Sequence, residues 1–142
     1  MKIWVPGIPR PKGSFKWIRG KTRPSSEYVE KWQAGIQWIA QAEWDADPAP
    51  APAAFGVWAK FIMPPPGRVA KLWPFPTKVP DGDKLLRAVF DALTGIVYID
   101  DAQVVEWGGR KVFVETADQV GAEIIVWRID ESGLRVQEPR ID

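Results

Sequence analysis

A chain of 142 residues, 46% of them hydrophobic, has the size and composition of one folded domain over 1–142. It contains neither cysteine nor histidine, which excludes thiol nucleophiles, Ser-His-Asp triads, zinc fingers and haem ligation. A metal site must therefore use oxygen ligands, which favour hard cations such as Mg2+ or Mn2+. No apolar run of about 18 residues and no signal-peptide pattern is seen, so we expect a cytoplasmic protein without a membrane span.

The net charge of +1 conceals an uneven distribution of basic residues. Residues 1–31 carry a net charge of +6, and residues 64–87 carry +3. A basic segment in a chain of neutral average indicates an anionic partner, with nucleic acid first among the candidates. A solvated, flexible basic arm explains the same pattern, and charge alone does not separate the two interpretations.

The N-terminal part of the chain predicts a strand followed by a basic arm. Residues 2–8 predict a short strand, which Pro6 restricts to a sheet edge or a strand end. Residues 9–24 are interpreted as a basic loop in which Phe15 and Trp17 stand among cations. Such alternation is typical of segments that follow phosphates and stack on bases, but it also suits a loop whose aromatic side chains pack onto the core.

A first helix is predicted from about Ser25 to Trp44, because hydroxyl and acidic residues at its start are typical of helix N-termini. The residues of its apolar stripe, which we expect to face the core, recur every three or four positions: Tyr28, Trp32, Ile36 and Ile39. Residues 45–54 form a Pro/Ala linker, interpreted as a plain connection.

The central part predicts a strand, a loop and a second helix. Residues 54–63 predict the strand, and 64–80 form a long basic and aromatic loop of a length that is uncommon unless it has a function or is mobile. A helix is predicted over 83–94, with Gly95 as its C-terminal cap. Its predicted buried stripe consists of Leu85, Leu86, Val89, Phe90 and Leu93.

The C-terminal part predicts two strands, over 103–115 and 120–129, joined as a hairpin. The polar tail 130–142 is expected to fray. The predicted order is therefore β-α-β-α-β-β, an α/β (α+β) single domain with a small mixed sheet packed by two helices.

Two groups of carboxylates stand at predicted element boundaries. Asp81 and Asp83 are at the entrance of the second helix, and Asp100 and Asp101 directly precede a strand. Divalent ions held by aspartates can neutralise a phosphodiester, activate water and stabilise the leaving oxygen. Aspartates also cap helices and occupy turns, so spacing alone leaves a structural role open.

The same helix predicts a charged face. Asp83, Arg87 and Asp91 follow an i, i+4, i+8 spacing and project to one side.

The segment from Pro80 to Gly95, followed by Tyr98-Ile-Asp-Asp-Ala-Gln-Val104 and then Lys111, resembles the RusA-like Holliday junction resolvases. That family has an Asp-x-Asp-Asn-Leu-x-Lys helix start, a Phe-Asp-Ala-Leu continuation, and an Asp-Asp-x-Gln-Val turn before a strand that carries a lysine. The segment 9–13 is a weaker match to the family's N-terminal basic loop.

The resemblance implies that Asp81, Asp83 and Asp101 are the metal-binding catalytic residues. It selects Asp101 over Asp100, which is expected to assist or to shape the turn. Asp91 matches the family's mid-helix aspartate and is expected to support the site.

Two positions depart from the family pattern, because Lys84 replaces its asparagine and Arg87 its helix lysine. Arginine keeps the charge but does not readily transfer a proton. If the family lysine acts electrostatically, Arg87 should substitute as a catalytic residue. If it acts in proton transfer, activity is reduced or Lys84 compensates.

The resemblance therefore implies a Mg2+-dependent, or Mn2+-dependent, endonuclease that resolves four-way junctions in DNA recombination and repair. We expect it to act as a homodimer in the cytoplasm of a bacterial cell, with a phage or prophage origin. The expected DNA-binding residues are Lys12, Lys16, Arg19, Lys84 and Lys111. The alternatives are a catalytically impaired junction-binding module and a carboxylate nuclease for other branched DNA.

Overall fold

A computed structural model describes residues 1–13, 15–18, 21–24, 26–66, 74–116, 119–130, 132 and 135–136. For 15–18, 21–24, 26 and 135–136 it describes the backbone alone. The expected DNA contact Arg19, residues 67–73 of the long loop and most of the polar tail lie outside the described residues.

The sheet has the strand order β1 (Lys2–Pro6), β6 (Gly121–Ile129), β4 (Ala54–Met63) and β5 (Val104–Phe113), and β7 (Arg135–Val136) pairs with β6. Strand β4 runs antiparallel to β6 and parallel to β5, so the sheet is mixed. The predicted fold class and the β-α-β-α-β-β order are confirmed.

The predicted hairpin between the last two long strands is wrong, because β4 lies between β5 and β6. The connection from β4 to β5 passes through a helix, and a strand that follows such a crossover pairs parallel to the first. The other side of β4 then remains open for β6. Strand β4 is the most apolar strand, and in its central position it is paired on both edges, with β5 and with β6.

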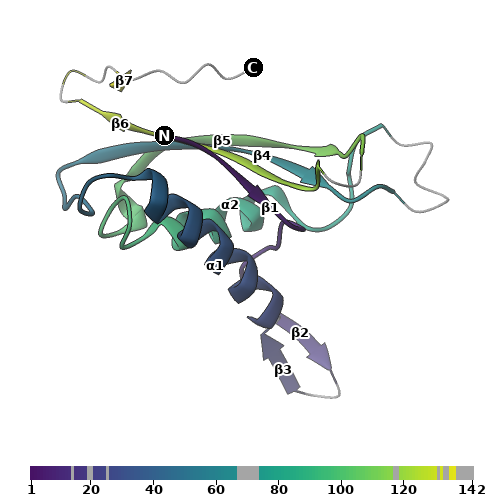
Figure 1. The fold of residues 1–142 in the computed structure, drawn as a ribbon. Helices are drawn as coiled ribbons and strands as arrows, with labels where there is room; N and C mark the ends of the chain where they lie inside the picture. Colours follow the sequence, from purple (N-terminus) through teal and green to yellow (C-terminus); the bar gives the residue numbers. More distant parts are fainter. Residues whose placement is uncertain are drawn as a thin grey trace.

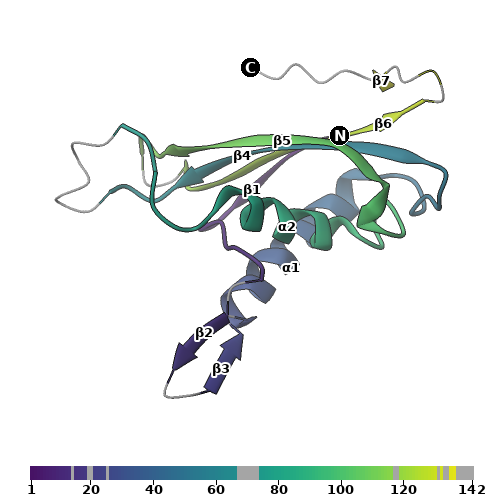
Figure 2. The same ribbon diagram turned by 180° about the vertical axis from the view of Figure 1, so that it is seen from behind.

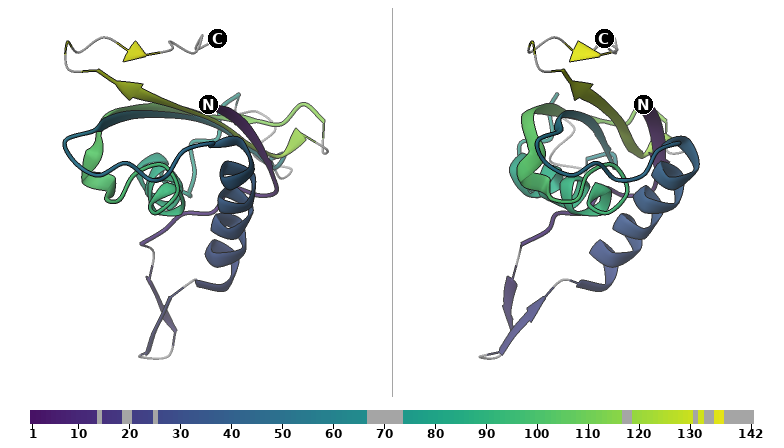
Figure 3. Two further views of the ribbon diagram at one scale, coloured as in Figure 1. Left: turned by 60° about the vertical axis from the view of Figure 1, so that its left-hand side comes forward. Right: turned by 90° about the vertical axis from the view of Figure 1, so that its left-hand side faces the viewer.

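The two helices, α1 (Ser26–Glu43) and α2 (Gly82–Leu93), contact each other and cover one face of the sheet (Figures 1 and 3). The inward-facing residues of β4 alternate along the strand and are fully or almost fully buried: Phe55, Val57, Ala59, Phe61 and Met63. The core therefore lies between this face of the sheet and the two helices.

The buried face of α1 differs in part from the predicted stripe. Trp32 and Ile36 are buried as expected, but Tyr28 is 63% exposed, and its ring lies under the guanidinium of Arg10 at 4.9 Å. Val29 and Ala40 are buried on this face, whereas Tyr28 is not. The reason is steric, since these smaller side chains let α1 pack closely on the sheet.

Helix α2 is confirmed within one residue of its predicted bounds. Leu85, Val89 and Leu93 are fully buried, whereas Leu86 and Phe90 are half-buried at the edges of the buried face. Gly95 follows the C-cap with a φ of +84°, as predicted for a glycine that ends a helix.

The predicted basic loop 9–24 contains a hairpin formed by β2 (Phe15–Ile18) and β3 (Lys21–Pro24). It projects from the start of α1, on the side of the molecule away from the sheet (Figures 1 and 2). The sequence predicted a basic loop and missed the two strands. Their backbone groups pair with each other, and such pairing cannot be read from the composition of the segment. Among the described residues, no helix is long and apolar enough to cross a membrane.

Candidate functional site

The start of α2 presents two exposed carboxylates. Asp81 is the N-cap residue, with an extended backbone, and its side chain makes no capping hydrogen bond. Asp83 lies in the first turn. The Lys84 ammonium lies 3.4 Å from an Asp81 carboxylate oxygen, so the two side chains form an ion pair.

Asp100 shapes the turn before β5. Its carboxylate accepts a hydrogen bond from the Ala102 amide at 2.8 Å and caps the short 3-10 helix η2 (Asp101–Gln103). Its backbone carbonyl accepts a hydrogen bond from the Gln103 amide at 3.0 Å. This is the turn-shaping role that the sequence had left as one of two expectations.

Asp101 lies beside Asp91, the aspartate near the end of α2. Burial, followed by the negative charges of Asp91 and Asp100 and by hydrogen bonds with both, raises the pKa of Asp101 above its ordinary value. The buried Tyr98 lies below this cluster and donates a hydrogen bond from its hydroxyl to the Phe90 carbonyl at 2.8 Å. Burial and then the charges of Asp101 and Asp91 raise the pKa of Tyr98 as well.

The segment before the β2–β3 hairpin crosses α2 and supplies a cation to the cluster. The Lys12 backbone amide donates to the Lys84 carbonyl at 3.0 Å, and its ammonium forms an ion pair with Asp91. Gly13 follows with a φ of +93°, and a Cβ atom there would lie 2.9 Å from the Arg87 guanidinium. The pairing of Lys12 with Asp91 was missed, and only the Pro-Lys-Gly pattern hinted that this segment closely approaches another element.

Lys111 contacts the chain that leads into Asp81. Its ammonium donates to the carbonyls of Lys78 at 3.0 Å and Pro80 at 2.8 Å. Strand β5 thereby anchors the start of α2 through this side chain. The expected contact of Lys111 with phosphate stays a prediction.

The candidate ligands fit a hard cation by their chemistry, because they are carboxylate oxygens. The negative charges of Asp91 and Asp100 also lie near Asp101, and a cation there would be attracted to all three. Within the described part of the chain, however, no three acidic side chains form a metal-binding group. Asp101 lies beside Asp91. Asp91 is about 12 Å from Asp83 along the helix axis, because each residue of a helix rises by about 1.5 Å. Convergence of Asp81, Asp83 and Asp101 on one ion therefore stays a prediction.

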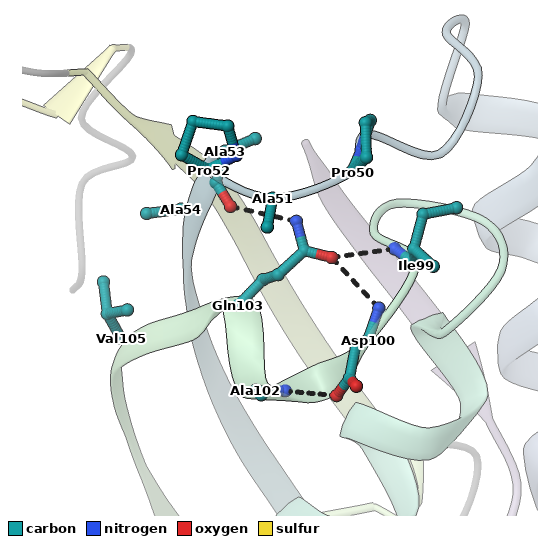
Figure 4. A pocket seen from close by; sticks show the side chains of 10 residues that line it. All are labelled: Pro50, Ala51, Pro52, Ala53, Ala54, Ile99, Asp100, Ala102, Gln103 and Val105. Atoms are coloured by element: carbon teal, nitrogen blue, oxygen red, sulfur yellow. Dashed lines mark hydrogen bonds between the residues drawn. The ribbon is translucent and has the colours of Figure 1, made fainter.

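The linker before β4 is more than a plain connection, and that expectation is corrected. The Ala49 amide donates to the Val97 carbonyl at 3.1 Å, and the Ile99 amide donates to the Ala49 carbonyl at 3.3 Å. The linker lines an open hollow of about 410 Å3 together with the residues around Asp100 (Figure 4). Backbone pairing of this kind is not visible in a Pro/Ala composition.

Exposed carboxylates can hold a metal ion, and the cations beside them and on the projecting hairpin can bind phosphates. The family model for Endodeoxyribonuclease RusA matches residues 6–126. The chain belongs to the RusA endodeoxyribonuclease family, and the predicted resemblance is confirmed. No match was found among curated proteins.

Proposed function

We propose that this protein is a Mg2+-dependent endonuclease that resolves four-way DNA junctions. The observation that carries the proposal is a row of carboxylates along α2 in a chain of the RusA family: Asp81 and Asp83 stand at the start of the helix, and Asp101 lies beside Asp91 near its other end. Burial, and then the negative charges of Asp91 and Asp100, raise the pKa of Asp101. A divalent cation would relieve that repulsion.

In this proposal Asp81, Asp83 and Asp101 hold the metal ion. When bound, the ion neutralises charge on the scissile phosphate and lowers the pKa of water. Arg87, one turn from Asp83 on the same helix face, binds a phosphate oxygen through its planar guanidinium. Asp91 and Lys12 support Asp101 from the side of α2.

Binding of the DNA backbone is proposed for the basic N-terminal arm and for cations near α2. Lys16 stands on β2 of the projecting hairpin, where the arm would reach phosphates outside the cleavage site. The proposed contacts are Lys12, Lys16, Arg19, Lys84 and Lys111. A four-way junction has approximate two-fold symmetry and is cut on two strands, so we propose a homodimer with two symmetry-related sites.

The test is incubation of the purified protein with a labelled synthetic four-way junction and Mg2+. We expect paired, symmetric cuts that disappear in Asp83→Asn and persist in Asp47→Asn, a matched change at an exposed linker residue. Binding of the junction without cleavage, in Mg2+ and also in Mn2+, would contradict the proposal that the protein is an enzyme. Preferential cutting of flaps would show that the substrate is another branched DNA and not the four-way junction.

One observation favours a second candidate function, a junction-binding protein with impaired catalysis. Lys84 stands where the resembling family has asparagine, and its ammonium pairs with Asp81, one of the proposed metal ligands. A cation held there competes with a metal ion for the same carboxylate. The chain would then retain DNA binding and require more metal for cleavage.

Lys84→Asn separates the two candidates. If Lys84 impairs the site, the substitution lowers the Mg2+ concentration for half-maximal cleavage, while binding to the junction in EDTA weakens or stays the same. Lys31→Asn, which removes an exposed cation of α1, is the matched control. An unchanged or higher Mg2+ requirement in Lys84→Asn would exclude the impairment.

A further inference from the structure

Gln103 is the one polar side chain that is buried among the described residues, with 8% of its surface exposed. Its amide makes four hydrogen bonds, two through Nε2 and two through Oε1. Figure 4 shows three of them, to Ala53, Ile99 and Asp100. A glutamine amide has two donor hydrogens and two acceptor lone pairs, so its hydrogen-bonding capacity is fully used. A buried and fully satisfied polar group of this kind specifies one local arrangement of the backbone.

The four bonds join two segments that are about fifty residues apart in the chain. Nε2 donates to the carbonyls of Ala49 and Ala53, both at 2.9 Å, in the linker that leads into β4. Oε1 accepts from the amides of Ile99 and Asp100, both at 3.0 Å, in the turn that leads into β5. The side chain therefore ties the entry of one strand to the entry of its parallel neighbour.

Asp101 lies inside the segment that these bonds hold. The Oε1 bonds are made just before it, at Ile99 and Asp100, and Gln103 itself is the last residue of η2. The Asp100 cap closes the same turn from the other side. The backbone on both sides of Asp101 is therefore held by bonds that Gln103 and Asp100 make.

We propose that Gln103 is a positioning residue, which holds Asp101 against α2 by joining its turn to the linker 49–53. The inference rests on the proposed function in so far as Asp101 binds the metal. An amide is required, because a carboxylate would face two carbonyl oxygens. An apolar side chain would remove all four bonds, and of the four backbone groups only the Ile99 amide and the Ala49 carbonyl would keep a bond, the one to each other.

The experiment compares Gln103→Met with Gln33→Met in the otherwise intact chain. Gln33 is a matched control, because its Nε2 donates to the Ala88 carbonyl at 3.0 Å and joins α1 to α2 away from the turn. Amide hydrogen exchange is measured first, without metal or DNA. We expect exchange of the Asp100 amide, which loses its bond to Oε1, to become about tenfold faster or more in Gln103→Met, and to stay unchanged in Gln33→Met. The Ile99 amide keeps its bond to the Ala49 carbonyl and should change less.

The second measurement is a Mg2+ titration without DNA, followed by the chemical shift of the Asp101 amide. We expect the midpoint to rise about tenfold in Gln103→Met, as for changes in residues that orient a ligand, and to stay the same in Gln33→Met. If Gln103→Met does not fold, Gln103→Thr replaces it, since the smaller side chain leaves room for water to bond the backbone groups. The expected shifts are then smaller but in the same direction.

Unchanged exchange at Asp100 would overturn the claim that Gln103 holds the turn. Faster exchange with an unchanged Mg2+ midpoint would overturn its positioning role. If the unaltered protein neither binds Mg2+ nor cuts DNA, the proposed function fails and the positioning of a metal ligand fails with it. Hydrogen exchange still decides in that case whether Gln103 orders the turn.

Discussion

The carboxyl groups of Asp91 and Asp101 lie within hydrogen-bonding reach of each other, although one belongs to α2 and the other to the turn before β5. Burial, and then the negative charges of Asp91 and Asp100, disfavour ionisation of Asp101 and raise its pKa. Lys12 pairs with Asp91 and so offsets part of the repulsion.

The first prediction concerns the pH dependence of stability without metal. Because the pKa of Asp101 is higher in the folded protein than in the unfolded chain, its ionised form opposes folding. Asp101→Asn should therefore raise the free energy of unfolding at pH 7. The gain should shrink as the pH falls through the folded pKa, and should vanish below about 3.9, the ordinary pKa of an aspartate.

Urea unfolding of both proteins between pH 3 and pH 8 in EDTA measures this difference. Asp47→Asn, at an exposed linker position, is the control and should show no such trend. A gain in stability that is the same at every pH would show that charge at Asp101 is not its cause.

The second prediction separates Lys12 from Lys16 by the salt dependence of junction binding. The ammonium of Lys12 is already paired with Asp91, so its contact with DNA would have to break that pair and would release fewer counterions. Lys16→Met should reduce the slope of log K against log salt by about 1, and Lys12→Met by much less. Equal slopes for the two variants would show that Lys12 leaves Asp91 to bind phosphate.

Lys12→Met has a separate effect on stability. It removes a partly exposed ion pair and should lower the free energy of unfolding by up to about 1 kcal/mol at low salt. Urea unfolding at low and high salt measures this loss, which should diminish as salt is added.

The third prediction concerns Lys111. Lys111→Met removes two hydrogen bonds to the chain before Asp81 and should lower the free energy of unfolding by about 1 to 3 kcal/mol. We also expect a higher Mg2+ requirement for cleavage with little change in junction binding in EDTA. Arg110→Met, at the exposed neighbouring position, is the control. A loss of DNA binding larger than that of the control would show that Lys111 acts on phosphate.

The fourth prediction concerns Gly13, whose φ of +93° is strained for other residues. Gly13→Ala should lower the free energy of unfolding by about 1 to 2 kcal/mol and displace the Arg87 guanidinium, which lies 2.9 Å from the position of the new Cβ. Gly82→Ala is the control, because nothing lies within 4 Å of its Cβ position. A Gly13→Ala variant as stable as the unaltered protein in urea would contradict the backbone argument.

Local patterns determined much of this protein from the sequence alone. The bounds of β4 and α2, the glycine after α2 and the absence of cysteine and histidine follow from short-range periodicity, capping chemistry and composition. Those properties depend on neighbouring residues, so they can be read without knowing where distant segments lie. The family pattern from Pro80 to Lys111 belongs to the same class of information.

The tertiary structure alone decided which distant groups meet. The insertion of β4 between β5 and β6, the contact of Asp91 with Asp101 and the attachment of Lys12 to Asp91 depend on how α2 crosses beneath the sheet. Gln103 could be read as part of a motif, but its partners in the linker 49–53 could not. The reason is physical, because buried backbone groups must be paired somewhere, and only the folded chain shows which partner lies within reach.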